Sequence, residues 1–130
     1  MKILVVDDED IVLDSCRRVL EAEGFEVLLV SCVDEALAAI EDEEPSLFLI
    51  DVKMPVHDGI YLMEDVKKKW PGKPIIVMSG YHTAETVKEA VSMGATRFIA
   101  KPFTPDELLE AVRQAIPKEE SHGKKGSPGN

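Results

Sequence analysis

Short runs of apolar residues recur along the chain and alternate with longer segments whose apolar residues follow a helical spacing. A strand buried on both faces is a short, continuous apolar run, whereas an amphipathic helix repeats its apolar positions about every three to four residues. The pattern therefore predicts strands and helices in turn. The predicted strands cover 1–6, 25–30, 47–51, 75–78 and 96–100.

Capping and turn residues mark the ends of the helices predicted between these strands. Asp10 is the expected N-cap of the first helix, and Gly24 is its expected left-handed C-cap. Thr83 is the expected N-cap of the fourth helix, and Pro105 suits the first turn of the fifth. Lys67-Lys68-Lys69 lies at the end of the third helix, where cations complement the helix dipole, and this favours a structural role over a binding patch.

Five strand–helix repeats predict an α/β fold, a doubly wound five-stranded parallel sheet of the flavodoxin-like (βα)5 type. Right-handed crossovers and the order 2-1-3-4-5 would place the first and third strands side by side at the switch point. Residues 1–117 are expected to form this single domain. Residues 118–130 are rich in Gly, Ser and Lys and contain no large apolar residue, so they are expected to form a flexible tail or linker.

Chemically useful polar residues follow four of the five predicted strands. Each one alone could be a turn residue or a solvated charge, but that explanation does not account for their common position. Because the carboxyl ends of parallel strands meet at one edge of a sheet, where ligands bind, we expect these residues to lie close together. They are Asp7, Asp8, Asp51, Ser79, Gly80 and Lys101.

The predicted cluster suits a divalent cation and a phosphoryl group. Neighbouring carboxylates repel one another unless a cation lies between them, and Mg2+, or Mn2+, takes carboxylate and phosphate oxygens. Lys101 supplies a further positive charge, and Ser79 supplies a hydroxyl donor. A carboxylate such as that of Asp51 can itself attack phosphorus and form an aspartyl phosphate.

Net charge, apolar run length and cysteine spacing exclude several classes of function. The formal net charge of −10 argues against binding to nucleic acid or to an anionic membrane surface. No apolar run approaches the ~20 residues that span a bilayer, and no signal-peptide pattern precedes the first strand. Cys16 and Cys32 lie among apolar neighbours without metal-ligand spacing, so both are expected to be buried free thiols in a reducing cytoplasm.

The strand-end motifs resemble those of the response-regulator receiver domain of two-component signalling. The motifs are Asp7-Asp8, Asp51-x-x-Met54-Pro55-x-x-Asp58-Gly59, Ser79-Gly80 and Lys101-Pro102-Phe103, and the resemblance covers roughly residues 2–116. It implies a domain that promotes its own phosphorylation and dephosphorylation but does not turn over an external product.

The resemblance also implies a role for each site residue. Asp51 would accept the phosphoryl group, and the Lys101 side chain would contact that group. The Lys101–Pro102 peptide bond would be cis, which would aim Lys101 at the site. Ser79 and Gly80 would bind the phosphoryl group, with Ser79 and Phe98 as the switch pair. The metal ligands would be Asp8, Asp51 and the backbone carbonyl of Lys53 directly, and Asp7 through water.

Partners and alternatives follow from the same resemblance. The expected partners are a sensor histidine kinase or phosphotransfer protein, a downstream output domain or protein, and a second copy in a phosphorylation-favoured homodimer. Lys53 and Tyr81 would tune dephosphorylation, whereas His57 and His82 are expected to be surface loop residues. One alternative is a phosphate-independent interaction module. Another is a Mg2+-dependent phosphatase, which Lys53 disfavours because such enzymes place a second Asp at that position.

Overall fold

The computed structural model describes residues 1–52, 59–80 and 83–116. Within these ranges, none of the helices combines the length and apolarity needed to cross a membrane. Strands and helices alternate along the chain as the sequence pattern predicts. The elements are β1 (Lys2–Val6), α1 (Asp10–Ala22), β2 (Glu26–Val30), α2 (Val33–Asp42), β3 (Leu47–Asp51), α3 (Gly59–Lys69), β4 (Ile75–Ser79), α4 (Ala84–Ser92), β5 (Arg97–Ala100) and α5 (Pro105–Ala115).

The five strands form one parallel sheet in the order β2-β1-β3-β4-β5, so the predicted fold class and strand order are confirmed. The register determines what meets at the carboxyl edge. Val6 of β1 pairs with Ile50 of β3, so Asp7 and Asp51 are level with each other one residue further along. Asp51 in turn pairs with Met78 of β4, and Ser79 follows directly.

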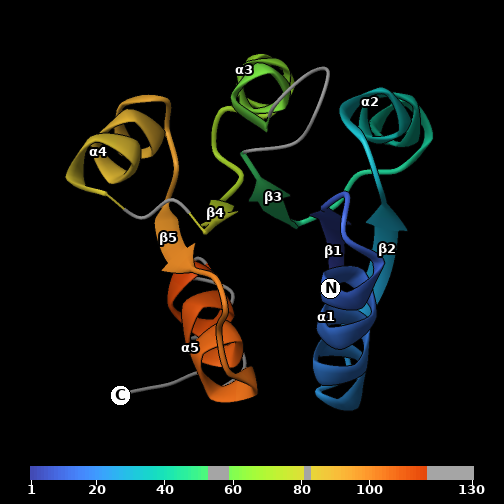
Figure 1. Ribbon diagram of the computed structural model, residues 1–130. Coiled ribbons are helices and arrows are strands. Elements are labelled where there is room, and N and C mark those ends of the chain that lie inside the picture. The colour runs from blue at the N-terminus through green and yellow to red at the C-terminus, as the bar shows by residue number, and fades with distance from the viewer. Residues whose placement is uncertain (53–58, 81–82, 117–130) are drawn as a thin grey trace, which may run out of the picture.

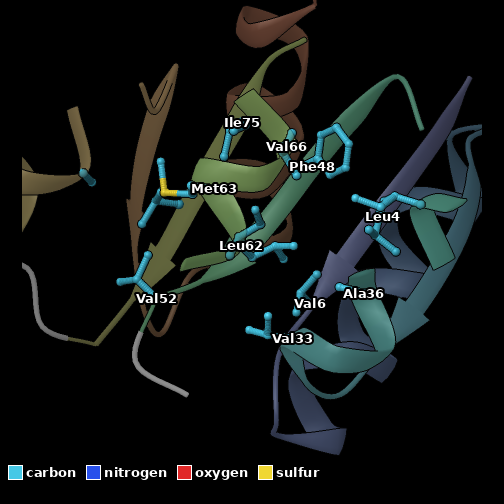
Figure 2. Packing of buried hydrophobic residues seen from close by; sticks show 14 residues of the cluster. Leu4, Val6, Val33, Ala36, Phe48, Val52, Leu62, Met63, Val66 and Ile75 are labelled. Atoms are coloured by element: carbon cyan, nitrogen blue, oxygen red, sulfur yellow. The ribbon is translucent and has the colours of Figure 1, made fainter. Parts of the chain in front are cut away.

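Helices cover both faces of the sheet (Figure 1). Helices α1 and α5 lie on one face, and α2, α3 and α4 lie on the other. Each face has its own buried apolar cluster, and β3 is buried along its whole length because it contributes to both. Figure 2 shows part of the cluster on the α2–α4 face, with Val33 and Ala36 of α2 near Val6 of β1, and Leu62 and Met63 of α3 over the centre of the sheet.

Most of the predicted helix ends are confirmed, and one is wrong. Gly24 has φ +91°, as a left-handed C-cap requires, and the Thr83 side chain accepts a hydrogen bond from the Thr86 N–H at 3.2 Å. Asp10 is the first helical residue rather than the N-cap of α1. That position belongs to Glu9, whose backbone N–H donates to Asp7 Oδ1 at 2.9 Å. The first turn of α1 therefore has no side-chain cap hydrogen bond, and Asp7 holds only the backbone of the N-cap residue.

The predicted structural role for the lysines that end α3 agrees with their contacts. Lys69 Nζ donates to the carbonyl of Ile40 at 2.9 Å and lies 5.0 Å from the centroid of the Trp70 ring. Lys73 Nζ lies 4.8 Å from the same ring, whose centroid is 5.9 Å from that of Phe48 on β3. The indole therefore packs on the sheet with two cations near its ring, at the end of the strands opposite to Asp51.

Both cysteines are free thiols, as predicted, but only one of them is buried. Cys16 on α1 is 0% exposed, and burial, followed by the charge of Asp7, raises its pKa to about 12. Cys32 is half-buried because it lies at the N-cap position of α2 rather than on a buried helix face.

We predict that Cys16 resists alkylation in the native protein. Between about pH 7 and pH 9 its thiol stays protonated and inaccessible, so iodoacetamide should modify Cys32 first and Cys16 only after denaturation in urea. Peptide mass spectrometry of samples quenched at increasing times would follow both sites. Equal modification rates of Cys16 in native and denatured samples would contradict the prediction.

Candidate functional site at the carboxyl edge of the sheet

Three carboxylates from the ends of two neighbouring strands meet at the carboxyl edge of the sheet. Asp7 and Asp8 follow β1 and Asp51 ends β3, and one carboxylate oxygen from each lies within 4.8 Å of the other two. Asp7 is 0% exposed and Asp51 is 4% exposed, whereas Asp8 lies on the surface. The structure thus brings together the acidic residues that the sequence pattern singled out.

Lys101, which follows β5, reaches across the sheet edge to this cluster. Its Nζ lies 2.7 Å from Asp7 Oδ2 and 3.1 Å from both Asp51 Oδ2 and Glu9 Oε1. The Lys101 side chain is only 15% exposed, so little water screens these contacts. Glu9 was not among the predicted site residues, although its place directly after Asp7-Asp8 in the sequence was a signal that could have identified it.

Burial and pairing compete at Asp7. Burial raises the pKa of its carboxyl group, although the Lys101 ammonium and the Glu9 N–H both oppose the rise. Burial would lower the pKa of Lys101, but its close pairing with the Asp7 carboxylate and the charge of Asp51 raise the pKa above its usual value. Asp7 Oδ2 pairs with Lys101 by charge and distance but receives no well-directed hydrogen bond, so this buried oxygen has capacity for a further ligand.

The donor set fits a hard divalent cation. All three candidate side chains offer carboxylate oxygens, which are the ligands that Mg2+ prefers, and the buried Asp7 oxygen has an incomplete hydrogen-bond shell. The remaining predicted ligand, Lys53, lies outside the described residues, as do Met54, Pro55, His57, Asp58, Tyr81 and His82.

The fourth and fifth strands bring the other predicted residues to the same edge. Ser79 ends β4 and is fully buried, and its carbonyl accepts a hydrogen bond from the Lys101 backbone N–H at 2.9 Å. Gly80, the next residue, is exposed. Phe98 on β5 is half-buried against the apolar cluster on the α2–α4 face. The peptide bond between Lys101 and Pro102 is cis, as predicted.

A cavity of about 750 Å³ opens beside the acidic cluster. Asp51, Lys101 and Gly80 line it on one side. Ile11 on α1 and Phe103 after β5 contribute apolar surface to its lining. The carboxylate of β3 therefore lines an opening that a partner group can enter.

Gly59, the first residue of α3, lies directly against the end of β3. Its N–H donates to the carbonyl of Val52 at 3.3 Å. A Cβ atom at this position would lie 2.4 Å from the backbone oxygen of Asp51 and 2.6 Å from Ile50 Cγ2. Only glycine permits this approach, so Gly59 is a positioning residue for the strand end that carries Asp51.

Comparison with known proteins agrees with this geometry. The family model described as the response regulator receiver domain matches residues 3–113. The chain belongs to the response regulator receiver domain family. The predicted resemblance is therefore confirmed, and receiver domains are regulatory rather than catalytic modules.

Solved receiver domains share the fold over most of the chain. A CheY-like receiver domain protein from Methanospirillum hungatei has a TM-score of 0.86 and 38% identity, covering 92% of this chain and 96% of that one. The receiver domain of NtrX from Brucella abortus has a TM-score of 0.83 and 38% identity, covering 88% of this chain and 97% of that one.

Curated relatives are longer proteins. The hydrogenase transcriptional regulatory protein HoxA of Cupriavidus necator is 41% identical over 115 residues, which are 88% of this chain and 24% of that protein. The regulatory protein AtoC of Escherichia coli is 35% identical, over 88% of this chain and 25% of that protein. The receiver domain described here therefore spans about a quarter of the length of these relatives.

We predict that Gly59→Ala destabilises the receiver domain by about 1–3 kcal/mol, because the added methyl group overlaps backbone and side-chain atoms of β3. Gly72→Ala is the matched control, since a Cβ there meets nothing within 4 Å, and its effect should stay within about 0.5 kcal/mol. Urea unfolding followed by circular dichroism measures both. Equal stabilities of the two variants would contradict the proposed close approach.

We predict that Lys101→Met lowers the free energy of unfolding at neutral pH by about 1–3 kcal/mol, because it leaves the buried Asp7 carboxylate without its cation. Lys88→Met on the exposed surface of α4 is the control and should be nearly neutral. Unfolding is measured with a chelator present, so that no divalent cation replaces the lost charge. A stability of Lys101→Met equal to the wild type would show that the ion cluster contributes nothing to folding.

Proposed function

We propose that this receiver domain accepts a phosphoryl group on Asp51 from a sensor histidine kinase or phosphotransfer protein, in a reaction that requires Mg2+. The observation that carries the proposal is the meeting of three carboxylates and one ammonium group at the sheet edge, with Asp51 lining the cavity beside them. Such a set pairs a carboxylate nucleophile with positive charge beside it.

In the proposed transfer, a carboxylate oxygen of Asp51 forms a bond to phosphorus. The bond from phosphorus to the donor's imidazole nitrogen breaks, and that nitrogen keeps the electron pair. The product is an acyl phosphate, which water later hydrolyses to restore the carboxylate. The domain returns to its starting state without releasing a product made from a substrate of its own, in keeping with a regulatory role.

The acidic cluster would hold the metal. Asp8 and Asp51 are the proposed direct ligands together with the backbone carbonyl of Lys53, and Asp7 would bind through water. When bound, Mg2+, or Mn2+ in its place, neutralises charge on the carboxylates and on the phosphoryl oxygens. The incomplete hydrogen-bond shell of the buried Asp7 oxygen supports this assignment.

Lys101, Ser79 and Gly80 are the proposed ligands of the phosphoryl oxygens. The Lys101 ammonium lies 3.1 Å from Asp51 Oδ2. It is therefore close enough to pair with the negative oxygens of a phosphoryl group attached to Asp51. Ser79 is at the end of β4, and its backbone carbonyl accepts a hydrogen bond from the Lys101 backbone N–H. This hydrogen bond would link a movement of Ser79 to the position of Lys101.

Ser79 and Phe98 are the proposed switch pair. Phe98 is half-buried on β5, three residues before Lys101, and it lines a second cavity, of about 570 Å³, between β5 and α5. Movement of Ser79 toward the phosphoryl group would make room for a shift of the Phe98 ring. That shift would alter the surface formed by α4, β5 and α5, as a population shift between two conformations.

The partner that donates the phosphoryl group would bind at the wall of the first cavity. Ile11 is 77% exposed on α1 and lines this cavity with Val12 and Phe103, close to Asp51. An exposed apolar side chain beside a reactive carboxylate favours contact with a protein donor. The chain covers only 24% of the relative HoxA. The proposed downstream partner is an output domain of the same protein or a separate protein. Phosphorylation would also favour a homodimer.

We predict that acetyl phosphate labels the wild-type domain on Asp51 only when Mg2+ is present. In this reaction the Asp51 oxygen attacks phosphorus, and acetate leaves with the electron pair of the broken bond. Intact mass should increase by one phosphoryl group in the wild type, and not in Asp51→Asn or in samples with chelator.

Two outcomes would contradict the proposal in different ways. Absence of labelling in the wild type, under conditions that label a known receiver domain, would support the phosphate-independent interaction module. Labelling that persists in Asp51→Asn would place the chemistry on another residue.

A further inference from the structure

Glu9 contacts the Lys101 ammonium, yet the function proposed above gives it no role. Its Oε1 atom lies 3.1 Å from Lys101 Nζ, and its side chain is 59% exposed. The backbone of Glu9 is fixed, because it forms the N-cap of α1 and its N–H donates to Asp7 Oδ1. The carboxylate is thus held at the rim of the cavity that leads to Asp51.

Three carboxylate oxygens surround the Lys101 ammonium. An ammonium group carries three N–H donors. The Nζ atom of Lys101 has three carboxylate oxygens within 3.1 Å, one each from Asp7, Glu9 and Asp51. A phosphoryl oxygen on Asp51 would compete with these carboxylate oxygens for the Lys101 ammonium.

Burial determines which contact opens at the lowest cost. Asp7 is 0% exposed, so release of its carboxylate would leave a charge buried without a partner. Asp51 carries the phosphoryl group itself and stays beside Lys101. Glu9 is the exposed member, and water can solvate its carboxylate after release.

We infer that Glu9 is a positioning residue that holds the Lys101 ammonium in the unphosphorylated domain and competes with the phosphoryl group for it. This inference rests on the proposed function of Asp51 and Lys101. Release of the Glu9 contact then contributes to the free-energy difference between the unphosphorylated and the phosphorylated domain. The Glu9 carboxylate, at the rim of the cavity, also repels an anionic group that approaches Asp51.

The test measures binding of a phosphoryl mimic rather than turnover. Beryllium fluoride with Mg2+ forms a tetrahedral anionic adduct on a carboxylate, and its dissociation constant is obtained from the shifts of the Ser79 and Gly80 amide signals in 15N–1H spectra. Glu9→Gln, which removes the charge, should bind the mimic about two- to fivefold more tightly than the wild type, as expected for the loss of one partly exposed ion pair.

Two further variants separate the contact from its charge. Glu9→Asp keeps the negative charge but shortens the side chain by one methylene group, so it should bind more tightly than the wild type and less tightly than Glu9→Gln. Glu41→Gln removes one negative charge from the exposed surface of α2 and should bind like the wild type. Urea unfolding of all variants checks that each is folded.

The outcomes distinguish this inference from the proposed function. If the wild type fails to bind the mimic in the presence of Mg2+, the proposed function itself fails. If the wild type binds and Glu9→Gln binds equally well, only the role of Glu9 is overturned. If Glu9→Gln binds more tightly while Glu9→Asp matches the wild type, the charge acts without the contact, and the positioning role is wrong.

Discussion

The ion cluster around Lys101 is the interaction on which the site depends. Carboxylates from two buried strands converge at one edge of the sheet, and such charges repel each other in a poorly solvated site. The ammonium of Lys101 balances this repulsion at 2.7 Å from Asp7 and 3.1 Å from Asp51. A phosphoryl group on Asp51 would need the same ammonium group. The stability of the site and the proposed chemistry therefore both depend on Lys101.

The fold supplies the precision of this cluster. Strand β3 is buried along its whole length between two apolar layers, so the strand end that carries Asp51 has little freedom to move. Gly59 lets α3 start directly against that strand end. The bond from the Lys101 N–H to the Ser79 carbonyl joins the fourth and fifth strands at the same level. The ends of β3, β4 and β5 are therefore held together at the edge where Asp51, Ser79 and Lys101 lie.

The acidic residues of the site differ in solvent exposure, and this difference determines which of them can lose a protein contact at low cost. The buried Asp7 requires a cation whenever it is ionised, because its charge has no access to water. Asp8 and Glu9 lie on the surface, and Glu9 can exchange Lys101 for water at low cost. The site can thus change ligands at its rim while its buried centre stays paired, which suits the proposed shift between two states.

The sequence by itself determined the order of strands and helices, the family and the acidic, hydroxyl and lysine residues at the sheet edge, because apolar runs and strand-end motifs are local patterns. It misplaced the N-cap of α1 by one residue, and it overstated the burial of Cys32, because both depend on how the chain turns after β1 and β2. Only the tertiary structure decided that Glu9 contacts Lys101, since these residues are separated by most of the chain and meet only when β1 and β5 are in one sheet.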